Sequence, residues 1–245
     1  MRWIGFAAMA VLTFFAYQVP PAKNFPDPEL ARMIFFHLPC AFATVGFILF
    51  ASYCSFSYLR TREWIWEYRS LAATEVSIGM AAATMITGIL FSRVQWGAWW
   101  HWDPRQTSFL IVLMLLGAYF AVRMAFDDEV ARARAAAVYS SLTLLPVLFL
   151  VFVFPRLPQV VKNSLHPSTT VQSGGFSKDY WTVVLGVFIV LLGTCMWLYR
   201  LHVQVSLLEQ RLRDRDGNLE SSGNRTTARR VDRPVSVPES DRHPS

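Results

Sequence analysis

A short segment near the middle of the sequence contains four of the nine tryptophans of the chain. It reads Trp96-Gly97-Ala98-Trp99-Trp100-His101-Trp102-Asp103. Indole rings at helix ends often anchor membrane proteins at the level of the lipid headgroups, and such anchoring explains one or two of them. Four in one loop, beside a glycine that permits a tight turn, indicate a platform for a large, flat, apolar ligand.

Two histidines lie on either side of this segment in the sequence. His37 is near the start of a long apolar run, and His166 is in a later loop that reads Asn163-Ser164-Leu165-His166. Imidazoles on opposite faces of a macrocycle can ligate heme iron axially, while indoles cover the apolar face of the ring. His101 lies within the platform, so we do not expect it to be a ligand.

Arginines in the same loops are candidate partners for heme propionates, because a guanidinium group pairs with a carboxylate through two parallel hydrogen bonds. Arg93, Arg105 and Arg156 meet this description, and the sequence does not choose among them. Asp103 also has a purely structural interpretation. With Pro104 at the first helical position and Gln106 at the third, it resembles the capping box that begins a helix.

The composition predicts an all-α integral membrane protein, because 53% of the residues are hydrophobic and the mean hydropathy is +0.32. A helix that crosses the lipid core needs about 20 mainly apolar residues. We expect a bundle of six transmembrane helices that fills residues 1–200, with heme-binding loops at the outer face, and a largely disordered arginine-rich tail over 201–245. The six apolar runs are roughly 3–19, 33–58, 71–91, 107–126, 136–154 and 180–199.

The net charge of +6 does not indicate nucleic acid binding, because the basic residues are spread along loops and the tail. They indicate the membrane topology instead. With both termini in the cytoplasm, 16 of the 23 lysines and arginines lie inside, as the positive-inside rule favours. The three cysteines form no CxxC or CxxCH pattern, and we expect Cys40, Cys54 and Cys195 to be small buried side chains.

The pattern Trp96-Gly97-x-Trp99-Trp100-x-Trp102-Asp103 resembles the signature of the WWD heme-handling family of cytochrome c biogenesis. The histidine followed by x-Pro at His37 and the Asn-Ser-Leu-His at His166 are similar to the cytochrome c maturation C (CcmC) branch, over roughly residues 30–200. The resemblance implies that His37 and His166 ligate the iron of non-covalent heme b. It also implies a bacterial inner-membrane carrier, not an enzyme, that works with ABC transporter subunits and delivers heme to a periplasmic heme chaperone.

Three alternatives stay open at this point. Asp103 is followed by Pro104, as in the related CcsA-type heme synthetase branch, although the chain is short for that branch. A membrane b-type electron-transfer cytochrome would hold heme between histidines within the helices, yet the apolar runs after residue 40 contain no histidine until His202. A subunit without heme, whose tryptophans serve only as membrane anchors, is the third.

Overall fold

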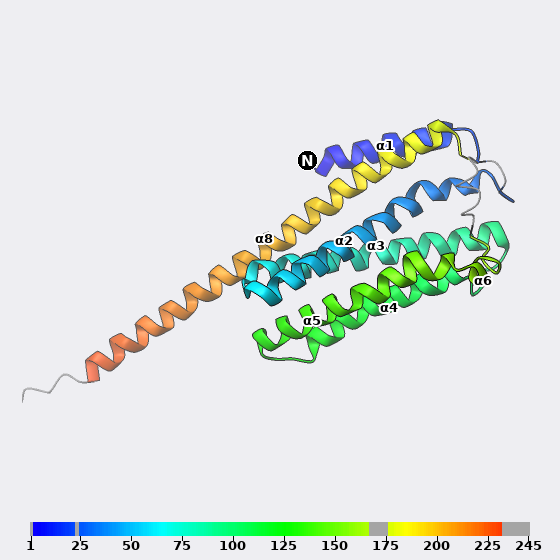
Figure 1. Ribbon diagram of the computed structural model, residues 1–245. Coiled ribbons are helices and arrows are strands. Elements are labelled where there is room, and N and C mark those ends of the chain that lie inside the picture. The colour runs from blue at the N-terminus through cyan, green and yellow to red at the C-terminus, as the bar shows by residue number, and fades with distance from the viewer. Residues whose placement is uncertain (1, 23–24, 167–175, 232–245) are drawn as a thin grey trace, which may run out of the picture. The chain divides into compact units, whose positions relative to one another are not determined.

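The computed structural model describes residues 2–22, 25–166 and 176–231, with side chains described as far as residue 216. Residues 167–175, which follow His166, and residues 232–245 of the predicted tail lie outside the described residues. The described residues form helices and no strand, which confirms the predicted all-helical class (Figure 1). In chain order the elements are α1 (Arg2–Gln18), η1 (Leu30–Met33), α2 (Ile34–Thr61), α3 (Trp64–Trp96), α4 (Pro104–Met124), α5 (Glu129–Leu148), the π-helical turn η2 (Phe149–Val153), η3 (Phe154–Arg156), α6 (Pro158–Val161) and α8 (Lys178–Val231).

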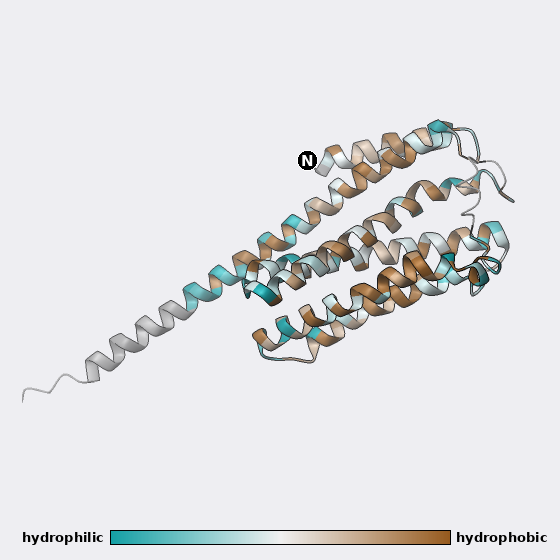
Figure 2. Ribbon diagram, viewed as in Figure 1, coloured by the Kyte–Doolittle hydropathy of each residue, from teal (hydrophilic) through white to brown (hydrophobic). Residues whose placement is uncertain are grey.

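Five helical stretches in the described part of the chain are long and apolar enough to cross a membrane. They are Leu30–Thr61, Trp64–Trp96, Pro104–Met124, Glu129–Arg156 and Lys178–Asp216. The first predicted span, residues 3–19, corresponds to the apolar helix α1 of 17 residues, which is shorter than the other five. The count of six spans therefore stays a prediction. Brown, apolar residues are prominent along α4 and α5 and in the first part of α8 in Figure 2, as helices in lipid require.

The chain divides into two compact units, Met1–Val203 and Gln204–Ser245. The second unit continues α8 as a helix to Val231. Residues 204–216 are rich in Gln, Leu, Glu and Arg, all of which favour helix. The predicted disorder of the arginine-rich tail stays a prediction.

Helix α3 begins at Trp64, seven residues before the predicted apolar span, and a charged group in its first turn is neutralised inside the bundle. Glu67 is buried, and its Oε1 lies 2.5 Å from an Arg123 nitrogen at the end of α4. Removing one partner of such a pair costs about 3 kcal/mol or more, because the other charge is left unpaired. The ion pair therefore holds α3 and α4 together at the end of the bundle opposite the tryptophan segment.

Small and hydroxylated side chains let α2 and α3 approach closely. Ala51 of α2 packs with Ala72 and Ala73 of α3, and the Ser55 and Ser70 hydroxyls are 2.6 Å apart. All three cysteines are free and buried, as the sequence predicted. The packed pair of α2 and α3 positions His37, the first predicted ligand.

Helix α1 packs against the first part of α8. Leu12 of α1 meets Gly186 so closely that a Cβ there would lie 2.7 Å from the Leu12 Cδ2. Ala16 and Val19 join the same buried cluster as Tyr180, whose hydroxyl donates to the Ala31 carbonyl oxygen at 3.0 Å. These contacts connect the N-terminal segment to the elements around His37.

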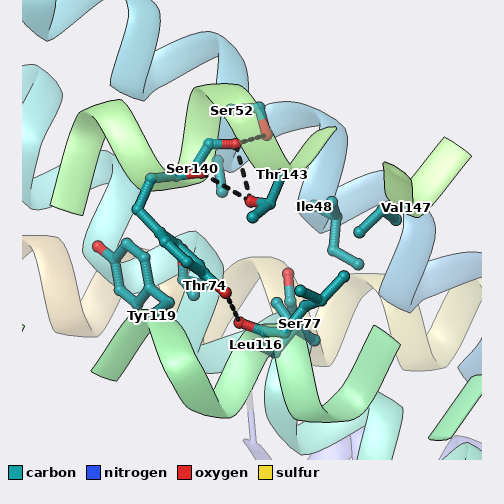
Figure 3. A pocket seen from close by; sticks show the side chains of 12 residues that line it. Ile48, Ser52, Thr74, Ser77, Leu116, Tyr119, Ser140, Thr143 and Val147 are labelled. Carbon is teal, nitrogen blue, oxygen red and sulfur yellow. Dashed lines mark hydrogen bonds between the residues drawn. The ribbon is translucent and has the colours of Figure 1, made fainter. Parts of the chain in front are cut away.

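A small cavity of about 20 Å³ lies between α2, α3, α4 and α5 (Figure 3). Hydroxyl groups line much of it, among them those of Ser52, Ser77, Tyr119 and Thr143, together with apolar side chains such as Ile48 and Val147. Its volume suits about one water molecule. None of the predicted heme-site residues lines this cavity, so it is separate from the site described below.

Candidate functional site

The start of α2, the end of α3, the start of α4 and the segment η3–α6 lie at one end of the bundle, which we call the loop end (Figure 1). Helix α3 ends at Trp96 because Gly97 adopts a left-handed conformation with φ +82°, and its N–H donates to the Arg93 carbonyl oxygen at 3.1 Å. Glycine takes this conformation without steric cost. The chain then returns through residues 98–103 to α4.

The four tryptophans of the segment differ in their surroundings. Trp96 packs edge-on against Phe91 beside the buried cluster, with 5.4 Å between ring centroids. Trp99 and Trp102 are exposed, at 56% and 74%, and Trp100 meets Trp102 edge-on. Trp102 has φ +55°, which is strained for a bulky side chain. Backbone strain of this kind clusters at binding sites, where the surrounding structure maintains it.

Two buried ring nitrogens in this segment have no hydrogen-bond partner in the part of the chain that the structure describes. They are Trp100 Nε1 and His101 Nε2. Buried polar atoms are nearly always hydrogen-bonded, so each has capacity for a ligand atom. The His101 ring lies edge-on to Trp96, 6.3 Å between centroids, within the loop as the sequence predicted.

Asp103 does more than begin α4. Its Oδ1 accepts a hydrogen bond from the Arg105 N–H at 2.8 Å, which confirms the predicted helix cap. Its Oδ2 accepts from the Ser164 hydroxyl at 2.9 Å and from the Leu165 N–H at 2.7 Å. The carboxylate is buried, and it joins the tryptophan segment to the two residues directly before His166.

The reciprocal half of the predicted capping box is not formed. The Gln106 side chain accepts from the His101 N–H at 3.3 Å and donates to the Trp99 carbonyl oxygen at 3.3 Å. In a capping box this side chain would accept from the backbone N–H of the cap residue. Gln106 thus forms hydrogen bonds with the backbone of the tryptophan segment instead of completing the helix cap.

His37 lies in the first turns of α2, where its ring meets α3. Its Nδ1 is 3.0 Å from the Thr87 Oγ1. A Cβ placed on the neighbouring Gly88 would be 3.2 Å from the His37 Cε1, so a larger residue there would press on the imidazole. Neither Thr87 nor Gly88 was singled out from the sequence, because a Thr-Gly pair within an apolar run is unremarkable on its own.

His166 is neutral at physiological pH. Burial, together with the positive charge of Arg105, lowers the pKa of His166 from 6.5 to about 3. A charge on His37 or Arg156 would act in the same direction, whereas Asp103 opposes it. The structure therefore brings His37 and His166, distant in sequence, into one electrostatic environment with Asp103, Arg105 and Arg156.

The three candidate arginines are not equivalent. Arg93 donates to the Gly97 carbonyl oxygen and lies over the Trp99 ring. Arg156 donates to the carbonyl oxygens of Val151 and Phe152, at 3.1 and 3.0 Å. The Arg105 guanidinium, which is half-buried, has no hydrogen bond or ion pair with any described residue.

A protein-family model described as "Heme exporter protein C" matches residues 1–218 of the chain. The chain belongs to the heme exporter protein C family. It is therefore a multi-pass membrane protein of the branch that the sequence resembled, and the CcsA-type alternative is not supported.

The chain is similar to relatives from bacteria and from a plant mitochondrion. The chain is 29% identical over 181 residues to heme exporter protein C of Bradyrhizobium diazoefficiens, covering 73% of this chain and 67% of the relative. It is 27% identical over 222 residues to heme exporter protein C of Escherichia coli K12, covering 85% of each chain. A putative cytochrome c biosynthesis ccmC-like mitochondrial protein of Marchantia polymorpha is 30% identical over 120 residues, 47% of this chain and 51% of the relative.

Proposed function

We propose that the chain binds heme b non-covalently at the loop end, with His37 and His166 as the axial ligands, and delivers it to a periplasmic heme chaperone. The heme-handling role in cytochrome c maturation follows from membership of the heme exporter protein C family. The observation that supports the ligand assignment best is the common environment of the two histidines, beside the tryptophan segment.

The properties of the two imidazoles suit axial ligation. Porphyrin nitrogens fill four positions around the iron, so two neutral imidazoles complete a six-coordinate centre. His166 is held neutral by burial, so its ring retains a lone pair. The exposed faces of Trp99 and Trp102 supply apolar area for the macrocycle, with Trp96, Gly97, Trp100 and Asp103 shaping the loop that presents them.

Arg105 is the best candidate for pairing with a heme propionate. The Arg93 and Arg156 guanidinium groups donate to backbone carbonyl oxygens, whereas that of Arg105 has no such partner among the described residues. Among the charged groups, Arg105 also has the largest effect on the pKa of His166, so a propionate bound there would lie beside the second ligand. The propionate carboxylate would neutralise the positive charge of the partly buried Arg105 guanidinium.

We place the loop end outside the bacterial inner membrane and both termini in the cytoplasm, because that orientation puts most arginines inside. An alkaline phosphatase fusion after Gly97 tests this assignment. We expect it to be active and a fusion after Arg132 to be inactive. The reverse pattern would contradict the orientation, and with it delivery to a periplasmic partner.

Delivery needs partners but no bond-making step by this chain, so we infer a carrier and not an enzyme. Its partners would be heme, membrane lipid, ABC transporter subunits of the maturation complex and the heme chaperone, with no role for nucleic acid.

Heme binding and delivery can be tested by purifying the tagged full-length chain in detergent. We expect a bis-histidine absorption spectrum, a pyridine hemochrome of heme b, and co-purification of an ATP-binding subunit or a periplasmic heme protein. A colourless protein would contradict heme binding, and heme without either partner would contradict the delivery complex.

A further inference from the structure

The contact between His37 and α3 fixes more than the position of the ring. The neutral imidazole has one N–H and one bare nitrogen, and only the bare nitrogen can bind a metal. Which nitrogen carries the proton is decided by the hydrogen bond that the ring makes. The His37 Nδ1 lies 3.0 Å from the Thr87 Oγ1, and the ring also has a hydrogen bond with the Thr84 backbone of the same helix.

The Thr87 hydroxyl has a single hydrogen, and that hydrogen is already donated. Its Oγ1 lies 2.8 Å from the Ala83 carbonyl oxygen and 3.1 Å from the Thr84 carbonyl oxygen, one turn earlier in α3. Carbonyl oxygens only accept hydrogen bonds, so Thr87 must be the donor in both contacts. Toward His37 its oxygen can therefore only accept. The donor in that contact is the Nδ1–H of His37.

We propose that Thr87 is a positioning residue that holds His37 as the Nδ1–H tautomer, so that Nε2 carries the lone pair offered to iron. The inference rests on the proposed function, in which His37 is an axial ligand. Gly88 contributes by allowing the imidazole to approach α3, because a Cβ there would lie 3.2 Å from the His37 Cε1. Thr87 and Gly88 lie on α3, which packs closely against the helix that carries His37.

The hydrogen bond also sets the donor strength of the ligand. An acceptor on Nδ1–H raises the basicity of the metal-binding nitrogen. A threonine oxygen is uncharged, and bonds between neutral groups are roughly half as strong as those with a charged partner. Thr87 thus strengthens the iron–histidine bond less than a carboxylate would. A weaker bond is suited to a heme that must be released to a partner protein.

The tautomer can be measured without heme. We would label the full-length chain with ¹⁵N-histidine, purify it heme-free in detergent, and assign the His37 signals by their loss in His37→Gln. We expect the Nδ1–H tautomer in the wild type and in Thr87→Ser. In Thr87→Val, which is nearly isosteric but has no acceptor, we expect a shift toward Nε2–H. A wild-type His37 in the Nε2–H form, or a Thr87→Val variant with an unchanged tautomer, would overturn the proposal.

Heme binding provides the second readout. We expect Thr87→Val to weaken heme affinity about tenfold and to raise the reduction potential of the bound heme, because outer-shell partners of ligating histidines typically contribute at least that factor. Thr87→Ser should retain most of the wild-type affinity. Thr74→Val is the matched control, because the Thr74 hydroxyl donates within α3, to the Ser70 carbonyl oxygen, and Thr74 makes no contact with His37.

The two hypotheses fail in different ways. If His37→Ala abolishes bis-histidine ligation while Thr87→Val retains both the wild-type tautomer and the wild-type affinity, the role of Thr87 is wrong and the ligand assignment stands. If His37→Ala leaves the heme spectrum unchanged, the ligand assignment is wrong. In that case the tautomer measured without heme no longer bears on iron binding, and the proposal is overturned with it.

Discussion

His37→Ala and His166→Ala are each expected to convert a six-coordinate bis-histidine heme into a weakly held or five-coordinate one. In the proposed assignment, each variant would remove the imidazole that ligates the iron on one face of the macrocycle. Absorption and electron paramagnetic resonance spectra of the purified variants measure the change. Adding free imidazole to His37→Gly or His166→Gly should restore the six-coordinate spectrum, which separates loss of a ligand from loss of the fold.

His101→Ala is the internal control for this prediction. His101 lies within the tryptophan segment, with its ring edge-on to Trp96, and we expect its removal to change the spectrum little. His202→Ala serves as a control further along the chain, because its imidazole pairs with Glu75. A bis-histidine spectrum that survives in His37→Ala or His166→Ala but is lost in His101→Ala would overturn the ligand assignment.

The second large effect on heme affinity is expected from substitution of Asp103, because its carboxylate accepts hydrogen bonds from the two residues before His166. Ser164 and Leu165 both donate to the buried Asp103 carboxylate, and these bonds hold the segment before His166 in place. Losing them should weaken the free energy of heme binding by about 2 kcal/mol, which is roughly a 30-fold weaker affinity. Asp103→Asn separates this role from helix capping. Asparagine caps helices as well as aspartate does, but its single acceptor oxygen cannot serve both Arg105 and Leu165.

Heme titration of Asp103→Asn, Asp103→Ala and Ser164→Ala provides the measurement. We expect both Asp103 variants to bind heme clearly more weakly, with Ser164→Ala between them and the wild type. Asp128→Asn is the matched control, because Asp128 caps α5 by accepting from the Ala131 N–H and makes no contact with the site. Wild-type affinity in Asp103→Asn would show that the carboxylate serves only as a helix cap.

Much of the fold could be predicted from the sequence, because lipid requires long apolar helices and the runs are visible in the composition. The ends of the helices could not. Helix α3 continues seven residues beyond its predicted apolar span, to the segment with Glu67, whose partner Arg123 is distant in sequence. Helix α8 continues beyond its apolar run into polar residues that favour helix.

For the candidate site, the sequence identified residue types but not their connections. The cap at Asp103 is a local pattern and was predicted, whereas its bonds to Ser164 and Leu165 join segments about 60 residues apart. Thr87 was missed for the same reason, since its importance depends on the packing of α3 against α2. The difference between Arg105 and the other two arginines became visible only through the carbonyl oxygens that those two contact.

The two histidines are mounted in different ways, and this difference has a kinetic consequence. His37 belongs to a helix packed against α3, whereas His166 follows a non-helical segment in which Ser164 and Leu165 donate to the Asp103 carboxylate. Moving His37 would require moving a helix, whereas the segment before His166 can shift when its hydrogen bonds to Asp103 exchange. If both histidines ligate the iron, as proposed, we expect an acceptor protein that brings its own ligand to replace His166 before His37.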